Sequence, residues 1–425
     1  MLVGVEWKAR GARGPHSLER AEESLDELGE LAASAGAQIV GRVFQSRVAV
    51  EAATLVGQGK VEEIAAAVRA ANVDTVIFDH DLTPTQQRNL ERVIGSKVID
   101  RTQLILDIFA SRARTREGRL QVELAQLNYL LPRLTGRGAE MSRLGGGIGT
   151  RGPGETQLER DRRRIGRRIK KLEDELEGVR AGRALHRRRR RAVPLATLAL
   201  AGYTNVGKST LFNRLTRAGV LADSRMFATL DPTIRPLVLP SRRRVLVSDT
   251  VGFIRNLPTT LVKAFRATLE EVKEAALILH VVDVAAPSAP EHAAHVRRVL
   301  AEIGAAEIPQ LLVLNKLDRL SEKERDCEAV RRRLLASEGC LSSAQVVAVS
   351  ALTGAGIEQL LTQIDEMLQL DRIVRTTLRL PLSDAITLAR LYEFGRVVAV
   401  RYGHQYCEVE VDIPESIRRQ FLGAN

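Results

Sequence analysis

The feature that most constrains this chain is a stretch of nine residues, Gly202-Tyr203-Thr204-Asn205-Val206-Gly207-Lys208-Ser209-Thr210. It matches the phosphate-loop pattern G-x-x-x-x-G-K-S, in which glycines allow a tight turn whose N–H groups point at phosphate oxygens. Lys208 adds a charge for the β- and γ-phosphates, and the Ser209 hydroxyl can bind Mg²⁺. An apolar run before it and helical spacing after it predict a strand–loop–helix unit whose helix dipole also favours the anion.

Length and composition set broad limits on the rest of the chain. Its 425 residues are enough for roughly two to four domains. No apolar run reaches the roughly 18 residues of a membrane span, and residues 1–14 lack the apolar core of a signal peptide. Cys327, Cys340 and Cys407 show no metal-ligand spacing. We therefore expect a cytoplasmic protein with free thiols, monomeric when it is not bound to a partner.

Positive charge is concentrated in one segment. The chain has a net charge of +12, whereas residues 112–191 contain 23 Lys and Arg but only 10 Asp and Glu, a net charge of +13. A basic block of this kind is typical of a protein that binds a polyphosphate partner such as RNA. The alternative interpretation is a solvated, charged helix face.

The hydrophobic pattern predicts a mainly α/β protein in four parts. These are an N-terminal α/β domain (1–111), a basic helical hairpin (112–192), a P-loop nucleotide domain (193–371) and a small α+β C-terminal domain (372–425). Strand and helix signals alternate in the first part, with one strand expected at Ile39–Phe44, so we expect a parallel sheet. The segment Gly57-Gln58-Gly59-Lys60 resembles a second phosphate loop, but without a full glycine pattern it is better interpreted as a strand-to-helix turn.

Two long helical patterns lie in the basic segment. One covers Val122–Leu131 and stops at Pro132, and the other covers Arg160–Arg191. The second has a thin apolar seam of four residues, Ile165, Ile169, Leu172 and Leu176, which predicts an antiparallel pair of helices. Between them, Gly145–Gly154 contains six glycines in ten residues, which predicts a mobile tip.

Two further stretches are suited to Mg²⁺ and to the γ-phosphate. Asp249-Thr250-Val251-Gly252 ends a strand, so Asp249 can hold a water on Mg²⁺ and the Gly252 N–H can sense the γ-phosphate. Before it lies Phe227-Ala228-Thr229-Leu230-Asp231, in which we expect Thr229 to supply the second Mg²⁺ hydroxyl, with Thr233 as the alternative. The expected metal ligands are thus Ser209 and Thr229, and the expected catalytic residues are Lys208, Thr229 and Gly252.

Two later stretches select the base. In Asn315-Lys316-Leu317-Asp318, the Asp318 carboxylate can accept from guanine N1–H and N2–H₂ together, and adenine offers no such pair of donors. In Ser350-Ala351-Leu352, the Ala351 N–H can donate to guanine O6. Because these stretches occur in this order, each at a strand end, they indicate a domain that binds GTP and GDP with Mg²⁺.

Several segments resemble the HflX family of ribosome-associated, translation-factor-related GTPases. They are GYTNVGKSTLFN, FATLDPT, DTVGFIRNLP, DHDLTPTQQRNLE and GGGIGTRGPGETQLE. The resemblance implies a GTPase that binds the large (50S) ribosomal subunit, with rRNA contacts through the basic hairpin and its glycine-rich tip. It further implies a role in splitting or rescuing stalled ribosomes or in ribosome biogenesis. The alternative is an ATP-dependent RNA-remodelling protein that uses the N-terminal region.

Phe253 departs from a common pattern. Many Ras-like GTPases place a glutamine directly after the glycine that corresponds to Gly252, and this glutamine orients the attacking water. A phenylalanine cannot polarise water, and its alternative role is to pack the segment. We therefore expect slow intrinsic hydrolysis that rises when a partner orders the site.

Overall fold

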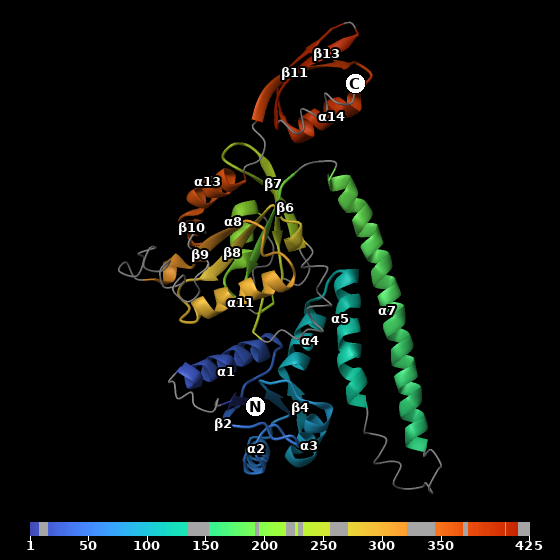
Figure 1. Cartoon of the computed structure of the whole chain (residues 1–425), viewed down its shortest axis with the longest axis vertical. Helices are drawn as coiled ribbons and strands as arrows, with labels where there is room; N and C mark the ends of the chain where they lie inside the picture. The colour runs from blue at the N-terminus through green and yellow to red at the C-terminus, as the bar shows by residue number, and fades with distance from the viewer. Residues whose placement is uncertain are drawn as a thin grey trace. The chain divides into compact units, whose positions relative to one another are not determined.

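The computed structural model describes residues 1–7, 16–134, 153–191, 195–217, 226–227, 233–255, 271–320, 345–368, 373–403 and 405–414 (Figure 1). These residues form two compact units. The first contains the described residues up to Val179 together with residues 226–227 and 250–255, and the second contains the others. Two short segments on either side of Asp249 in the sequence therefore group with the N-terminal part of the chain.

A four-stranded parallel sheet lies at the centre of the first unit, with strand order β2-β1-β3-β4. Its strands are β1 (Leu2–Trp7), β2 (Arg42–Arg47), β3 (Thr75–Phe78) and β4 (Lys97–Asp100). They alternate with α1 (His16–Ser34), α2 (Gln58–Ala70), α3 (Pro84–Ile94) and α4 (Arg101–Arg112). This is the parallel α/β architecture that the sequence predicts.

The edge strand β2 begins three residues later than the predicted start at Ile39. Its own residues are only partly buried, whereas Ile39 and Val40 lie exposed just before it. Because an edge strand lacks a fully buried face, its apolar pattern is a poor guide to its bounds.

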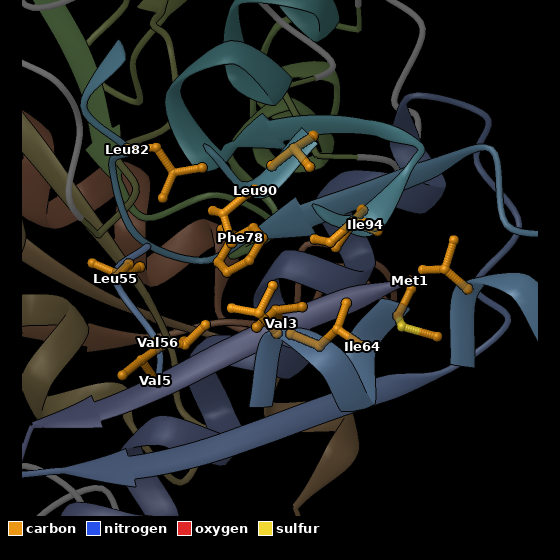
Figure 2. Packing of buried hydrophobic residues seen from close by; sticks show 14 of the residues in the cluster. Met1, Val3, Val5, Leu55, Val56, Ile64, Phe78, Leu82, Leu90 and Ile94 are labelled. Carbon is orange, nitrogen blue, oxygen red and sulfur yellow. The ribbon is translucent and has the colours of Figure 1, made fainter. Parts of the chain in front are cut away.

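An apolar core lies between this sheet and the helices α2 and α3. Val3, Ile64, Phe78 and Leu90 are each 0% exposed and meet in one cluster (Figure 2). Local signals place α3 over it. The helix begins after Thr83, whose hydroxyl accepts from the Gln86 N–H while the Gln86 side chain accepts from the Thr83 N–H.

Polar residues at the carboxyl ends of β3 and β4 are paired with one another. The Arg101 guanidinium, 2% exposed, donates to Asp79 Oδ1 and to Glu27 Oε2, each at 2.7 Å. Burial alone would lower the pKa of Arg101, but the Glu27 and Asp79 carboxylates raise it. Asp79 also accepts from Ser24 Oγ at 2.5 Å. The network links α1, β3 and α4.

A second set of contacts joins the sheet to the helical pair. Asp100 is fully buried, and its carboxylate accepts from the Tyr129 hydroxyl at 2.8 Å and from the Arg133 guanidinium at 3.0 Å. The same guanidinium lies 3.4 Å from the centre of the Tyr129 ring. Burial raises the pKa of Asp100, although its hydrogen bonds oppose the change. These contacts hold the end of α5 (Arg116–Leu130) and the short 3₁₀ helix η1 (Leu131–Leu134) against β4.

The helices α5 and α7 (Pro153–Arg191) lie antiparallel (Figure 1). Glu123 accepts two bonds from Arg168 at 2.7 and 2.8 Å, and Arg116 lies 3.9 Å from Glu175. Partners that move in opposite directions along the two helices define the antiparallel register. Their apolar seam consists of Leu120, Leu124, Leu127, Leu172, Leu176 and Val179.

Both helices start earlier than their apolar patterns suggest. α5 starts at Arg116 because Thr115 caps it, accepting from the Gly118 N–H at 3.0 Å. α7 starts at Pro153, a residue type that suits a first helical turn. Of the predicted tip, Pro153 and Gly154 thus belong to α7, and the rest lies outside the described residues.

A six-stranded sheet forms the larger part of the second unit, with order β10-β9-β8-β5-β7-β6. Its strands are β5 (Thr197–Gly202), β6 (Thr233–Val238), β7 (Arg244–Asp249), β8 (Leu277–Asp283), β9 (Gln310–Asn315) and β10 (Gln345–Ala348). All are parallel except β6, which pairs antiparallel with β7. The helices described beside them are α8 (Lys208–Thr216), α11 (Ala289–Glu302), α13 (Ile357–Met367) and the short η2 (Leu317–Arg319).

The C-terminal part is a small antiparallel sheet covered by one helix. Its elements are β11 (Ile373–Pro381), α14 (Ala385–Phe394), β12 (Arg396–Tyr402) and β13 (Tyr406–Pro414), with strand order β11-β13-β12. Leu391 of α14 packs on Val409 and Val411, all 0% exposed. A hairpin across Gly403 joins β12 to β13. Among the described residues, no helix has the length and apolar character needed to cross a membrane.

Candidate nucleotide-binding site

The phosphate loop joins β5 to α8, and two of its glycines are required by close neighbours. A Cβ on Gly202 would lie 2.4 Å from the Val281 carbonyl oxygen, and one on Gly207 would lie 2.4 Å from Asn315 Nδ2. Gly207 also has a φ of +92°, which L-residues rarely adopt. Because α8 begins at the next residue, its first N–H groups are directed toward the loop.

Lys208 is held at the centre of this loop. Its ammonium donates to the Tyr203 carbonyl at 2.6 Å and to the Gly202 carbonyl at 3.1 Å, and the residue is 7% exposed. Burial lowers its pKa to about 8, against the opposing effect of the Asp249 carboxylate. The chain therefore maintains a buried cation where a phosphate group would supply the matching charge.

The groups predicted to serve Mg²⁺ lie next to one another. Ser209 Oγ donates to Asp249 Oδ2 at 2.8 Å, and Asp249 is fully buried at the end of β7. Thr233, the alternative second hydroxyl, is the first residue of β6 and pairs with Asp249 across the sheet. Hydroxyl and carboxylate oxygens are ligands that Mg²⁺ prefers, so this donor set fits the ion.

The Asn315 side chain connects the expected base-binding loop to the phosphate loop. Its Nδ2 donates to the Val206 carbonyl at 2.8 Å, and its Oδ1 accepts from the Ala351 N–H at 3.0 Å. The next residue, Lys316, donates to the Asn205 carbonyl at 2.7 Å. Segments from the ends of β5, β9 and β10 are thus joined by hydrogen bonds at one edge of the sheet, where open α/β sheets bind ligands.

Asp318, the residue expected to recognise guanine, is exposed on η2 and oriented by one contact. Its Oδ1 accepts from Ser350 Oγ at 2.5 Å. Arg214 of α8 holds the neighbouring loop, donating to the carbonyls of Ala351, at 3.1 Å, and Leu352. The second carboxylate oxygen and the exposed edge of this loop are suited to a base with two adjacent donors.

Four predicted site residues, Ala228, Thr229, Leu230 and Asp231, lie outside the described residues. Phe227, just before them, has a φ of +58° and packs edge-on against Phe109 of α4, with ring centroids 4.6 Å apart. The N–H of Met226 donates to Ser34 Oγ at 2.9 Å. The role of Phe227 in nucleotide binding stays a prediction. The structure shows instead that its ring packs on Phe109 within the first unit.

The segment after Asp249 is largely buried. Thr250, Val251, Phe253 and Ile254 are between 0% and 7% exposed. This burial fits the interpretation of Phe253 as a packing residue. Arg255 follows, and its guanidinium lies 3.6 Å from the Glu23 carboxylate of α1. With Gly252 between them, these residues belong to the first unit.

The segment Gly57–Lys60 has the contacts of a plain connection. The Gly57 N–H donates to Gln45 Oε1 at 3.1 Å, and Lys60 forms an ion pair with Glu63 at 2.6 Å. α2 begins directly at Gln58. The Gly57 N–H and the Lys60 ammonium thus both have partners within the chain. This favours the strand-to-helix turn over a second phosphate loop.

Sequence reasoning missed three contributors to the site. Asp283 ends β8 and forms an ion pair with Lys316 at 2.6 Å, and its signal was present, because an acidic residue follows a buried strand as Asp249 does. Arg214 gave no such signal, since the carbonyls that it binds are 137 and 138 residues away. The third is His292 of α11, which stacks on the Tyr203 ring with centroids 3.8 Å apart, another long-range contact.

Comparison with family models covers most of the chain. Residues 22–110 match the model described as GTP-binding GTPase N-terminal, and residues 112–190 match GTP-binding GTPase Middle Region. Residues 197–316 match 50S ribosome-binding GTPase, and residues 266–370 match Elongation factor Tu GTP binding domain.

Individual relatives also match over most of the chain. A protein named GTPase HflX from Alkalihalophilus pseudofirmus is 56% identical over 304 residues, which cover 72% of each chain. Its namesake from Escherichia coli is 47% identical over 379 residues, 88% of this chain and 86% of the relative. A solved structure of a GTP-binding protein from Sulfolobus solfataricus in complex with GDP is 24% identical, with a TM-score of 0.44, covering 86% of this chain and 98% of the other.

Proposed function

Because this chain belongs to the HflX family of GTPases, we propose that it is a GTP-driven switch that binds the large (50S) ribosomal subunit and acts on stalled ribosomes or in ribosome biogenesis. The P-loop fold and GTP hydrolysis with Mg²⁺ are properties of the family. The subunit, the rRNA contacts and the role in splitting or rescue are the proposal. The description of the matched family model as a 50S ribosome-binding GTPase supports it.

The observation that carries the proposal is a row of exposed cations on α7. Between residues 160 and 171, five arginines and two lysines are exposed: Arg160, Arg162, Arg163, Arg164, Arg167, Lys170 and Lys171. In the next turns of the helix, Glu173, Asp174 and Glu177 are exposed acidic residues. The basic part is therefore a distinct surface, suited to the phosphates of RNA.

Arg168 does not belong to this surface, although it has the same charge. Its guanidinium makes two bonds to Glu123 of α5 and helps to hold the helical pair together. Arg163 differs, because its ion pair with Glu159 lies within α7 and is largely exposed. A charge-reversal experiment should therefore spare Arg168, so that loss of binding is not loss of the helical pair.

The test reverses the charge of Arg162, Arg163, Arg164 and Arg167 to glutamate. Binding of the variant to isolated 50S subunits should weaken at least about tenfold, and its dependence on salt should flatten, because fewer counterions are released. A matched control reverses four other exposed arginines, Arg69, Arg88, Arg92 and Arg298, and makes the same change in net charge. If both variants bind with the same affinity and salt slope, the surface on α7 is only a solvated helix face.

Nucleotide turnover separates the main proposal from ATP-dependent RNA remodelling. We expect slow GTP hydrolysis by the free protein, since Phe253 cannot orient water, and faster hydrolysis with 50S subunits. ATP turnover stimulated by RNA would instead favour the remodelling activity. Within GTP turnover, Thr229→Ala should impair Mg²⁺-dependent hydrolysis more than Thr233→Ala, and the reverse order would assign the hydroxyl ligand to Thr233.

The glycine-rich segment from Gly145 to Gly154 provides a second test of the ribosomal role. We propose that it enters a crowded RNA site in which only a bare backbone fits. Replacing residues 145–152 by a four-residue turn keeps Pro153 and Gly154, which begin α7. The shortened protein should retain GTP affinity and basal hydrolysis but fail to split ribosomes. Splitting at the normal rate would make the segment a simple connector.

A further inference from the structure

We propose that Asp283 is a positioning residue for nucleotide binding, which acts through Lys316 on the backbone of the phosphate loop. The Lys316 ammonium lies 2.6 Å from Asp283 Oδ2 and donates to the Asn205 carbonyl at 2.7 Å. Both side chains of the ion pair are mostly buried, with 17% of Lys316 and 13% of Asp283 exposed. The inference concerns nucleotide affinity, so it does not depend on the ribosomal role proposed above.

The Asp283 carboxylate is itself fixed by the fold. Its Oδ1 accepts from the Ala285 N–H at 3.0 Å, two residues along the chain. The residue ends β8 and pairs in register with Asn315 of β9, and the Val284 N–H donates to the Asn315 carbonyl at 3.1 Å. One carboxylate oxygen is thus held by the local backbone while the other faces Lys316, so contacts within the chain are enough to place the charge.

Lys316 is oriented by this charge and by its own backbone. It has a φ of +69° in the turn between β9 and η2, which sets where its side chain leaves the chain. Since its ammonium contacts a carboxylate and a carbonyl, its charge is already compensated and is not directed at a phosphate. Its role is therefore to bind the loop rather than the ligand.

The carbonyl that Lys316 binds determines where the loop's N–H groups point. Within a trans peptide, the carbonyl of one residue and the N–H of the next point in opposite directions. A bond that draws the Asn205 carbonyl toward Lys316 therefore turns the Val206 N–H the other way. Asn315 does the same one residue later, because it binds the Val206 carbonyl and so orients the Gly207 N–H. Inward N–H groups are what a phosphate loop offers its anion.

The Asn205 backbone needs such support. Its φ of +59° lies in the left-handed region, which asparagine tolerates better than most residues but does not prefer. The contact from Lys316 stabilises this conformation from outside the loop, and Asp283 keeps Lys316 in position. Loss of the Asp283 charge should leave the loop populating other conformations, in which fewer N–H groups face the phosphates.

The experiment measures release of a fluorescent GDP from the full chain after rapid mixing with excess GDP. Asp283→Asn, which keeps the shape but removes the charge, should speed release about tenfold, and Asp283→Glu should restore at least part of the slow rate. Lys316→Met should speed release as well. If Asp283 acts through Lys316, the double variant that combines Asp283→Asn with Lys316→Met should release GDP no faster than Lys316→Met alone.

A matched control distinguishes positioning from general loss of structure. Asp365 of α13 is also a carboxylate with two hydrogen bonds, from the Ser241 N–H at 2.8 Å and from Ser241 Oγ at 2.7 Å, and neither of these bonds reaches a nucleotide loop. Asp365→Asn should lower the urea midpoint without changing the GDP release rate. The proposal is overturned if Asp365→Asn and Asp283→Asn speed GDP release to the same extent for the same drop in urea midpoint. It is also overturned if the effects of Asp283→Asn and Lys316→Met on the release rate simply add.

Discussion

The two parallel sheets of this protein have the same kind of edge but use it differently. In the N-terminal sheet the charged residues at the strand ends are paired with one another, as Arg101 is with Asp79 and Glu27. In the larger sheet one buried cation at the strand ends, Lys208, is held instead by two loop carbonyls. The two carbonyls carry no net charge, and the Asp249 carboxylate acts on Lys208 electrostatically. The comparison suggests that a sheet edge suits an anionic ligand when a buried cation there is hydrogen-bonded to carbonyls rather than to a carboxylate.

The largest expected effect comes from removing the cation of the network that Arg101 forms with Asp79 and Glu27 in the N-terminal sheet. Arg101→Leu leaves Asp79 and Glu27 buried without their cation, which should lower the free energy of unfolding by about 3–5 kcal/mol. Unfolding in urea is followed by far-UV circular dichroism. The control is Arg92→Leu at an exposed site. A loss as small as in the control would mean that the network is not essential to the sheet.

At the nucleotide-binding edge of the larger sheet, removing a charge should affect nucleotide binding rather than folding. Asp318→Asn removes the acceptor expected for the two guanine donors, so GDP affinity should fall by on the order of 3 kcal/mol. Binding of xanthine nucleotides should improve, because their base has an acceptor where guanine has its amino group. The urea midpoint should hardly change, since Asp318 is exposed. Unchanged GDP affinity in calorimetry would refute the assignment of guanine recognition to Asp318.

His280 tests a third situation, a buried titratable group without a closing carboxylate. It lies inside β8, 2% exposed, and burial together with Arg297 lowers its pKa to about 3. The unfolded chain binds a proton near pH 6.5, the folded chain only near pH 3, so stability falls as the pH drops between these values. From pH 7 to 4.5 this residue alone should cost about 2–3 kcal/mol. His280→Leu should remove that part of the acid sensitivity in urea titrations, and an unchanged pH slope would contradict it.

The smallest expected effect on stability comes from losing one hydrogen bond at the edge of the N-terminal sheet. Tyr129→Phe removes the hydroxyl that donates to buried Asp100 and should lower stability by about 1–2 kcal/mol. Arg133 still compensates the carboxylate, which is why the loss should be smaller than for Arg101→Leu. Tyr392→Phe, at a side chain 56% exposed, is the control and should change stability little. Equal losses in the two variants would show that the Asp100 network tolerates gaps.

The same contrast explains how much could be predicted from the sequence. The phosphate loop was found because its glycines, lysine and serine are adjacent in the chain and each has a local backbone or ligand requirement. The alternation of apolar runs predicted both parallel sheets for a similar reason. The roles of Arg168 and Arg214 could not be predicted, since their partners lie 45 residues or more away. A charged residue that closes a contact and one that faces a ligand look the same in a sequence.

Bounds of elements were harder to predict than their existence. The start of α5 depends on the Thr115 cap rather than on apolar spacing, and the start of β2 lies in a half-buried edge strand. Asp283 shows the opposite case. Its position after a buried strand was a usable signal, but its meaning requires the distance to Lys316.

The glycines of α7 have a consequence for the motion of the chain. Gly178 and Gly182 lie on either side of Val179, the last residue of the seam with α5 and the end of the first unit. Apart from its chain neighbours and the backbone of α7, no described atom lies within 4 Å of where a Cβ would be on either residue, so no packing contact there requires glycine. Each weakens the helix by about 1 kcal/mol relative to alanine. Amide hydrogens at this turn should therefore exchange with solvent through local opening, earlier than those of the turns that face α5.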